Sequence, residues 1–182
     1  MMQYILAIGA FLMFANAVNG QSECSQACVC PVGYTVGPGP NNTMKQCYKA
    51  VQSNTNWIQS ERRCIANGGH LTSLHNEAQD VFIADLAAPL LSQCTNILQC
   101  GIAIGGIAIG NSSQFRWTDG SAFDYNNWYG TEPSINLNEH CASVSTFTPT
   151  NSSIVPTIWN SIHCSDIALG AAVCAVPCSC CK

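Results

Sequence analysis

The stretches Phe115–Gly120, which reads FRWTDG, and Tyr125–Trp128, which reads YNNW, decide the fold of this chain. Both lie in a segment from Gly110 to Asn138 that is rich in Asn, Ser, Gly and aromatic residues. A loop of that length in a compact domain is usually functional or disordered. The segment is therefore the first place to look for a binding site.

Two helices are predicted on the N-terminal side of this segment. The first begins near Asn54 or Asn56 and stops at Gly68-Gly69, a pair that favours a helix end. We expect it to carry Trp57, Ile58 and Cys64, and to point Glu61 and Arg62 outward. The second begins at Asn76, an N-cap with Gln79 as its capping-box partner. Its apolar positions near helical spacing are Val81, Phe82, Ile83, Leu86 and Leu90.

Strands are predicted around and after the segment. Gly101–Ile109 is apolar on both faces and suits a buried strand, although the pair Gly105-Gly106 also permits two short strands that meet at a hairpin turn. Three shorter strand-like pieces follow, at residues 142–147, 157–159 and 171–176.

Composition indicates a secreted protein. The only long apolar run, Tyr4–Ala17, spans about 14 residues, too few to cross a bilayer, and is followed by small residues that suit signal-peptidase cleavage. No Lys or Arg precedes it, which departs from the usual signal pattern. We expect residues 1–20 to be a signal peptide, and nothing after residue 20 to be a membrane anchor. Three sequons, at Asn41, Asn111 and Asn151, agree with secretion and predict glycosylation.

The cysteine count and the charge narrow the function classes. Thirteen cysteines in an oxidising compartment indicate a disulfide framework, and the alternative is a cysteine-rich zinc site. The formal net charge is −4, and the six basic residues are scattered. Nucleic acid needs a clustered cationic face, so we expect no nucleic-acid partner.

Residues 30–176 resemble the C-type lectin-like domain family. Besides the two opening stretches, the resemblance rests on the cysteine spacing, on Gly69–Leu74 followed by Asn76-Glu77, and on the order of these motifs along the chain. The cysteine and tryptophan positions that match are Cys30, Cys47, Trp57, Cys64, Cys141, Trp159, Cys164 and Cys174. It implies an α+β fold with two helices, a small antiparallel sheet and a long loop region stapled by disulfides. The expected organisation is a signal peptide (1–20), a cysteine-containing segment (21–29), the domain (30–176) and a cysteine-rich tail (177–182).

The resemblance implies the bridges Cys30–Cys47, Cys64–Cys174 and Cys141–Cys164. Cys94 and Cys100 are close enough in sequence to pair with each other. The remaining cysteines flank the domain, so cross-pairing between the two ends is plausible; they are Cys24, Cys28, Cys178, Cys180 and Cys181. Because five is odd, one thiol should be free or intermolecular, and we expect a disulfide-linked homodimer.

In sugar-binding members of the family, one calcium ion in the long loop completes its coordination with paired sugar hydroxyls. The matching positions here, expected to bind both calcium and sugar, are Glu132, Ser134, Glu139 and Asn160, with Ser161 as a further calcium ligand. Ser134 and Ser161 stand where the family has an amide or carboxylate, so two carboxylates remain and the site is weakened. Pro133 marks a cis peptide. Other candidate oxygens are Asp124, Asn136, Asn138 and Asp166.

Alternatives to these site assignments remain open. Glu132 and Glu139 can also be solvated loop acids. Trp117 and Trp128 are expected to pack the core of the loop rather than a sugar. His70, His75 and His163 are expected to lack the acidic or thiol partner of a catalytic constellation, and His140 is expected to be neither metal ligand nor base. No catalytic residue is predicted, so we expect no enzyme.

Three functions are compatible with the sequence. The leading hypothesis is a secreted lectin that recognises glycans or glycoproteins, on microbes or on host cells. The second is a lectin-like domain that has lost its metal and binds a protein partner. The third is a structural or matrix protein cross-linked through its odd cysteine.

Overall fold

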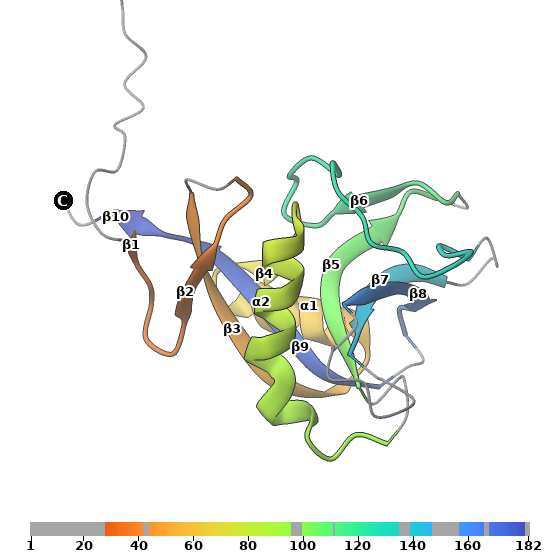
Figure 1. Ribbon diagram of the computed structural model, residues 1–182, viewed down its shortest axis with the longest axis horizontal. Helices are drawn as coiled ribbons and strands as arrows, with labels where there is room; N and C mark the ends of the chain where they lie inside the picture. The colour runs from red at the N-terminus through yellow and green to blue at the C-terminus, as the bar shows by residue number, and fades with distance from the viewer. Residues whose placement is uncertain are drawn as a thin grey trace, which may run out of the picture.

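The computed structural model in Figure 1 describes residues 28–41, 44–95, 100–110, 112–134, 139–146, 157–165 and 168–180. For Glu139 and Cys180 it describes the backbone alone. The predicted signal peptide, Cys24, Cys181 and the sequons at Asn111 and Asn151 lie outside these residues.

The described residues form ten strands, two α-helices and one 3₁₀ helix. The helices are α1 (Trp57–Ala66), α2 (Glu77–Ala87) and η1 (Ala88–Leu91). The strands are β1 (Cys28–Val29), β2 (Thr35–Pro38), β3 (Lys45–Thr55), β4 (His70–Leu71), β5 (Gly101–Ala108), β6 (Phe115–Trp117), β7 (Glu139–Ser145), β8 (Ile158–His163), β9 (Leu169–Pro177) and β10 (Ser179–Cys180).

One eight-stranded sheet organises the domain. Its order is β2-β3-β9-β5-β7-β8, with β4 paired to β9 and β6 paired to β5. All these pairs are antiparallel except β5 with β9, which run parallel. The α+β class with two helices is therefore confirmed, but the sheet is larger than the small antiparallel one expected, and it is mixed.

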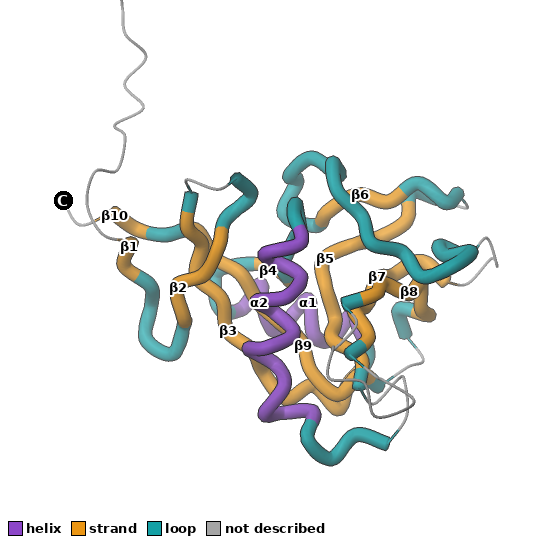
Figure 2. The backbone as a smooth tube through the Cα atoms, viewed as in Figure 1, coloured by secondary structure: helices purple, strands orange, loops and turns teal. Residues whose placement is uncertain are grey.

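Alternate residues of the central strands enter two separate cores. Ile102 and Ile104 of β5 pack in the core beneath α2, whereas Ala103 between them packs in the core with Trp57 of α1. Because side chains of a strand alternate between the two faces of a sheet, one sheet can serve two helices on opposite faces. Figures 1 and 2 show α2 in front of the sheet and α1 behind it.

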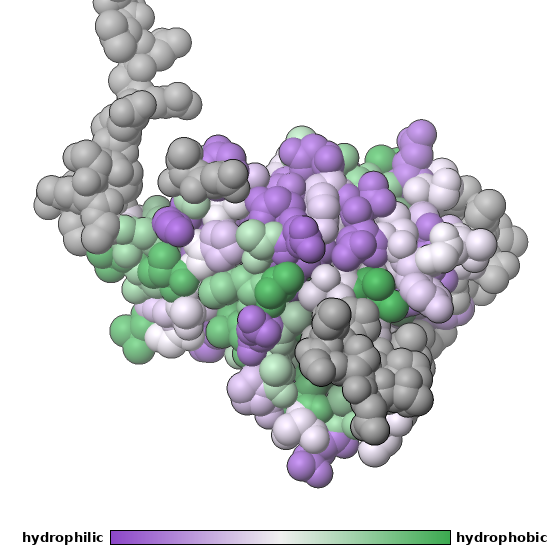
Figure 3. Space-filling model, in the orientation of Figure 1, coloured by the Kyte–Doolittle hydropathy of each residue, from purple (hydrophilic) through white to green (hydrophobic). Residues whose placement is uncertain are grey.

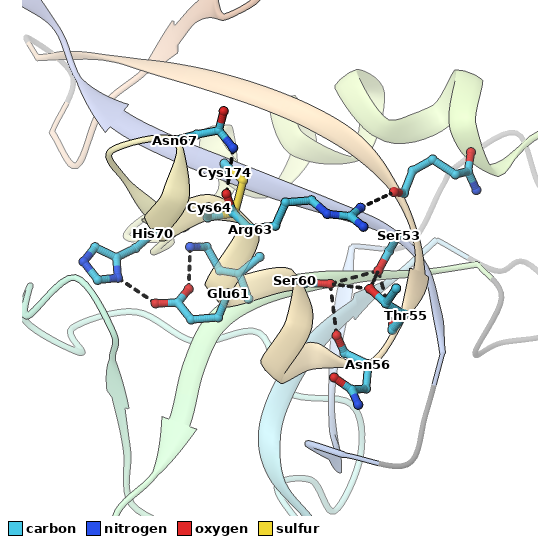
Figure 4. Close-up of a disulfide and its surroundings, with 12 residues drawn as sticks. Ser53, Thr55, Asn56, Ser60, Glu61, Arg63, Cys64, Asn67, His70 and Cys174 are labelled. Carbon is cyan, nitrogen blue, oxygen red and sulfur yellow. Dashed lines mark hydrogen bonds and ion pairs between the residues drawn. A yellow bond between two sulfur atoms is a disulfide. The ribbon is translucent and has the colours of Figure 1, made fainter.

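Helix α1 begins where the sequence predicted, but one side chain that was expected to face solvent is buried. Asn56 is the N-cap, and its side chain accepts a hydrogen bond from the Gln59 nitrogen over 2.9 Å. Glu61 was expected to point outward, but it is 8% exposed. Its carboxylate lies 2.6 Å from His70 Nδ1 and accepts from the Leu71 nitrogen over 2.8 Å (Figure 4). Glu61 therefore ties α1 to β4.

Helix α2 begins at the predicted cap. Asn76 Oδ1 accepts from the Gln79 nitrogen over 3.0 Å, while Gln79 Oε1 accepts from the His75 nitrogen over 2.7 Å. The second bond goes to the residue before the cap, so the capping box is shifted by one residue. Ile83 is fully buried and Val81 is 46% exposed, so the apolar residues do not all face the core.

The pair Gly105-Gly106 lies inside one continuous strand, so the hairpin alternative is wrong. The register of β5 with β7 slips between Ile104 and Ile107, which makes the two glycines a bulge. A Cβ atom on Gly105 would lie 2.5 Å from the Leu71 carbonyl oxygen. Glycine is thus required there by the close approach of another backbone.

Five disulfides join ten of the cysteines in the described ranges. Three are the bridges that the family resemblance implies, Cys30–Cys47, Cys64–Cys174 and Cys141–Cys164. The fourth is Cys94–Cys100, which was inferred from sequence proximity. The fifth, Cys28–Cys178, joins the two ends of the domain beside the pairing of β1 with β10. Cross-pairing of the flanking clusters is thus confirmed for one pair.

Candidate functional site

The long loop is held against strand β8 by its backbone. The Trp159 nitrogen donates to the Asn127 carbonyl over 2.8 Å, and the Tyr129 nitrogen donates to the Trp159 carbonyl over 2.9 Å. A bridge between Trp128 and Trp159 lies between these two bonds. Residues 127–129 therefore extend the sheet edge at β8, and they fix where the loop continues toward Glu132.

Aromatic side chains form the core of the loop. Trp117 and Trp159 are 2% and 0% exposed, and their ring centroids lie 5.5 Å apart. Trp128 packs edge-on against Trp159 and 4.8 Å from Phe115. The expectation that Trp117 and Trp128 pack the core of the loop is confirmed. These tilted and edge-to-face ring contacts stabilise the loop.

Glu132 and Ser161 meet at the tip of the loop. The Glu132-Pro133 peptide is cis, as predicted. Glu132 Oε2 accepts hydrogen bonds from the Ser134 nitrogen over 2.9 Å, from the Ser161 nitrogen over 3.0 Å, and from the Ser161 hydroxyl. The Ser134 nitrogen also donates to Ser161 Oγ over 2.9 Å. Three of the predicted site residues, Glu132, Ser134 and Ser161, are thus brought together.

The other predicted ligands are placed only in part. Asn160 lies in β8 next to Ser161, at the register position opposite Ser143 of β7. The Glu139 backbone begins β7 and pairs with His163 of β8. Asn136, Asn138 and Asp166 lie outside the described residues. Asp124 Oδ1 lies 2.7 Å from His75 Nδ1, so this candidate oxygen already contacts a histidine.

The described residues fit calcium only weakly. Calcium takes six to eight oxygen ligands and favours carboxylates. Glu132 is the one predicted ligand among the described side chains that has a carboxylate, and its Oε2 already accepts two N–H groups and a hydroxyl. Its Oε1 takes part in none of these three bonds. Apart from Glu132, the predicted ligands among the described side chains are the neutral groups of Asn160, Ser134 and Ser161, which make a weak set for a hard dication.

A residue that the sequence did not single out anchors this loop. Asp80 on α2 is fully buried, and its carboxylate accepts from Trp159 Nε1 over 2.8 Å, from the Tyr125 hydroxyl over 2.8 Å and from Asn127 Nδ2 over 3.4 Å. Burial raises the pKa of Asp80 to about 6. The three hydrogen bonds lower this pKa in part, and the nearby negative charge of Glu77 raises it further. The sequence signal was its place on the buried face of α2, three and four residues before Ile83 and Ala84.

Two histidines have acidic partners, contrary to the expectation for them. His70 Nδ1 lies 2.6 Å from Glu61, and His75 Nδ1 lies 2.7 Å from Asp124. Asp124 is 49 residues from His75, and Glu61, 9 residues from His70, lies on a different element, so the sequence spacing did not reveal either pair. The nearby hydroxyl of Ser73 donates to Asp119 over 2.6 Å rather than to a histidine. Burial would raise the pKa of Asp119, but hydrogen bonds from Ser121 and Ser73 hold it below its usual value.

Four described cysteines cluster closely enough to be considered as a zinc site. The sulfur atoms of Cys28, Cys30, Cys47 and Cys178 all lie within 4.8 Å of one another. They form two disulfides, so none is a thiolate that could bind a metal. The cluster is a structural staple.

A cavity of about 320 Å³ lies away from the predicted site residues. It is lined by Gln52, Asn54, Leu90, Gln93, Cys94, Ala168, Leu169 and Gly170. None of these side chains is ionisable, since Cys94 is in a disulfide, and none is a predicted calcium or sugar ligand.

The surface shows where polar contacts are available. In Figure 3, hydrophilic side chains gather over the start of α2 and the neighbouring loop, and hydrophobic ones gather over β2 and the middle of α2.

Asn41, the described sequon residue, is exposed, and its Oδ1 accepts from the Met44 nitrogen. Within the described ranges, neither helix has the length and apolar character that crossing a bilayer requires.

Comparisons with known proteins agree with this architecture. The Lectin C-type domain model matches residues 53–176. A type-2 ice-structuring protein from Brachyopsis segaliensis is 27% identical over 88% of this chain and 80% of its own. The galactose-specific lectin nattectin from Thalassophryne nattereri is 28% identical over 72% of this chain and 77% of its own. The structure of a calcium-independent type II antifreeze protein superimposes with a TM-score of 0.64 and 26% identity, covering 85% of this chain and 99% of that one. Because the family model matches more than half of its length and the fold agrees, this chain belongs to the C-type lectin family.

Proposed function

We propose that this chain is a secreted lectin-like protein that recognises glycans or glycoproteins, including those on microbes, through the loop tip around Glu132, Ser134 and Asn160. The observation that carries the proposal is the hydrogen bond from the Ser161 nitrogen to Glu132 Oε2 over 3.0 Å, which holds the Glu132 carboxylate against β8. Carboxylate, amide and hydroxyl groups gathered on a rigid edge are suited to hydrogen-bond sugar hydroxyls. The galactose-specific relative supports this class of ligand.

Calcium is proposed as a weak contributor at the same site. When bound, the ion would coordinate the paired hydroxyls of a sugar. Glu132, Glu139 and Asn160 would hold it, with the oxygens of Ser134 and Ser161. Since Ser161 supplies no charge, the affinity should fall at the weak end of extracellular modules, roughly 10⁻⁴–10⁻³ M.

The test is glycan-array binding followed by retention on galactose and mannose columns, each with calcium and with chelator. Glu132→Gln and Glu139→Gln should each reduce calcium-dependent retention severely, because each removes about half of the anionic ligand charge. Asp124→Asn is the matched control, since Asp124 contacts His75. Retention that is equal in all variants would contradict the proposed site.

A metal-independent domain that binds a protein partner is the second candidate. It is favoured by the way the Ser161 hydroxyl and two peptide nitrogens satisfy Glu132 Oε2 without an ion. A calcium-independent neighbour also exists among the solved structures. This candidate expects no response to calcium, to chelator or to the two glutamate variants. Because the neighbours include ice-structuring proteins, a thermal-hysteresis measurement on the same sample separates that activity from both candidates.

The proposed function also includes secretion through a cleaved signal peptide and covalent assembly through disulfides. Signal-peptide cleavage near residue 20 and glycosylation at Asn41 should appear in the intact mass of the secreted protein. A matrix role would require disulfide cross-linking beyond a dimer, which non-reducing gels would detect as higher oligomers.

A further inference from the structure

One carboxylate connects helix α2 to both parts of the proposed site. Asp80 accepts from Trp159, which directly precedes Asn160 and Ser161 in β8. It also accepts from Tyr125 and Asn127, which belong to the loop that leads to Glu132. Asn127 Nδ2 donates in addition to the Thr157 carbonyl over 2.9 Å, so the loop and the start of β8 are joined beside Asp80.

The charge of Asp80 has no cationic partner among the described residues. The ion pairs found there join His70 with Glu61 and His75 with Asp124. The titratable groups that act on Asp80 are Glu77, one turn earlier on α2, and Tyr125 from the loop. A buried charge that only neutral donors stabilise is costly and readily takes up a proton.

We propose that Asp80 positions the glycan-binding loop, and that protonation of its carboxylate releases part of the loop from α2 and weakens glycan binding in mildly acidic solution. The effect on binding rests on the function proposed above; the structural switch does not. Asp80 acts through Trp159 and Asn127 and is a positioning residue.

Protonation changes the hydrogen-bond count at a site where three donors already converge. Asp80 Oδ1 serves Trp159, and Oδ2 serves both Tyr125 and Asn127. A proton from solvent on Oδ2 adds a donor there and reduces the capacity of this oxygen to accept hydrogen bonds. The Tyr125 hydroxyl can rotate and accept, but the Asn127 amide nitrogen cannot. The contact between Asn127 and α2, which is already 3.4 Å long, is therefore weakened, while the 2.9 Å bond from Asn127 to the Thr157 carbonyl remains.

The test is a pH titration, from 7.5 to 4.5, of the Trp159 Nε1–H signal in ¹H–¹⁵N NMR spectra of the full chain, assigned with Trp159→Phe. The wild-type signal should shift with a midpoint near pH 6, since burial raises the pKa of Asp80 to about 6. Asp80→Asn should remove the transition. Tyr125→Phe removes a hydrogen bond that favours the charged form, so the midpoint should rise by about half a pH unit. Tyr125→Phe keeps Asp80, so its shifted midpoint tests whether Asp80 causes the transition even if Asp80→Asn fails to fold.

Histidines titrate in the same range, so His75→Gln is the control. The transition should survive in His75→Gln. If it disappears there and persists in Asp80→Asn, or if wild type shows no transition, the proposal is overturned.

Retention on the sugar column that binds best gives a second, separate readout. From pH 7.5 to pH 5.0, wild-type retention should fall about fivefold, and Asp80→Asn should show the same retention at both values. Absence of sugar binding at every pH with an intact NMR transition would contradict the proposed function and leave the switch standing. An equal acid-dependent loss in wild type and Asp80→Asn would overturn the positioning role.

Discussion

The nitrogen and the hydroxyl of Ser161 both donate to one oxygen of Glu132, at the position where sugar-binding relatives are expected to have a third carboxylate. Ser161→Asp should therefore have two effects. Calcium binding should tighten by about tenfold, roughly 1.4 kcal/mol, because an anionic ligand is added. Without calcium the protein should be less stable than wild type, because two carboxylates then face each other.

Calcium titration by calorimetry, together with thermal unfolding with and without 10 mM calcium (about tenfold above the weak end of the module range), checks both effects. Ser161→Asn is the control, since it has a similar shape and no charge. If neither wild type nor Ser161→Asp binds calcium at that concentration, the calcium-dependent site does not exist.

Gly105 is a position where the packing does not tolerate a side chain. Gly105→Ala would place a Cβ atom 2.5 Å from the Leu71 carbonyl oxygen, which is backbone and cannot turn away. We expect destabilisation of about 2–4 kcal/mol in chemical unfolding. Gly110→Ala meets no atom within 4 Å, although Gly110 has a positive φ, so its smaller loss measures backbone strain alone. Equal losses in the two variants would contradict the packing argument.

Much of the fold could be predicted because its signals are local or cysteine-based. The caps Asn56 and Asn76 fix the starts of the helices through bonds to residues three positions on. The disulfide partners follow from the order of motifs in the family. The strand β5 was ambiguous, because a glycine pair is compatible with a turn and with a close backbone contact. The contact between Gly105 and Leu71 decides this, and it joins residues 34 positions apart.

The site could be predicted less completely, because its decisive contacts are long-range. Glu61 was placed outside by its charge, yet its bond to the Leu71 nitrogen draws it inward. His75 meets Asp124 only after the loop folds over α2. The role of Asp80 depends on Trp159, which is 79 residues away. The hydrogen bonds from Ser161 to Glu132 depend on the approach of β8 to the loop, 29 residues further along the chain, which the residue types alone do not predict.

The bridge Cys64–Cys174 should contribute more to stability than a local one. It closes a loop of 110 residues, which corresponds to about 4–5 kcal/mol in the chain-entropy model, whereas Cys94–Cys100 spans only 6 residues. Replacing both Cys64 and Cys174 by Ala should therefore lower the free energy of unfolding by about 2–3 kcal/mol more than replacing Cys94 and Cys100. Urea unfolding of the two double variants measures this difference, and equal losses would refute the loop-length argument.

Covalent dimerisation is expected from the cysteine count. Of the thirteen cysteines, ten are in the five disulfides described, and Cys24, Cys180 and Cys181 remain. An odd remainder leaves at least one sulfur for a second chain or another thiol. Non-reducing gels should show a dimer that reductant converts to monomer, and peptide mapping should find the intermolecular bond among these three cysteines. A monomer with no free thiol and no small-molecule adduct would contradict this expectation.

The buried charge of Asp80 makes the stability of the protein depend on pH. Its pKa is raised by burial from 3.8 to about 6 in the folded chain. Between these values the folded state binds more protons than the unfolded state, so the free energy of unfolding rises as pH falls from 7 to 4. The full difference of about two pKa units corresponds to roughly 3 kcal/mol. This gain is global and is compatible with the local release of Asn127, because protonation removes a buried charge.

The difference between wild type and Asp80→Asn isolates this contribution. The variant has no charge to lose, so its free energy of unfolding should lack the rise of up to roughly 3 kcal/mol that wild type gains on acidification. Asp119, whose pKa is lowered in the folded chain, loses stabilisation as pH falls through its unfolded value of 3.8, and because this loss occurs equally in wild type and in Asp80→Asn, it cancels in their difference. Urea unfolding at pH 7, 6, 5 and 4 gives the measurement, with His75→Gln to account for histidine titration. Suppose that the free energies of unfolding of wild type and Asp80→Asn change in parallel across these four pH values. Asp80 then does not titrate between pH 4 and 7, and burial does not raise its pKa as described.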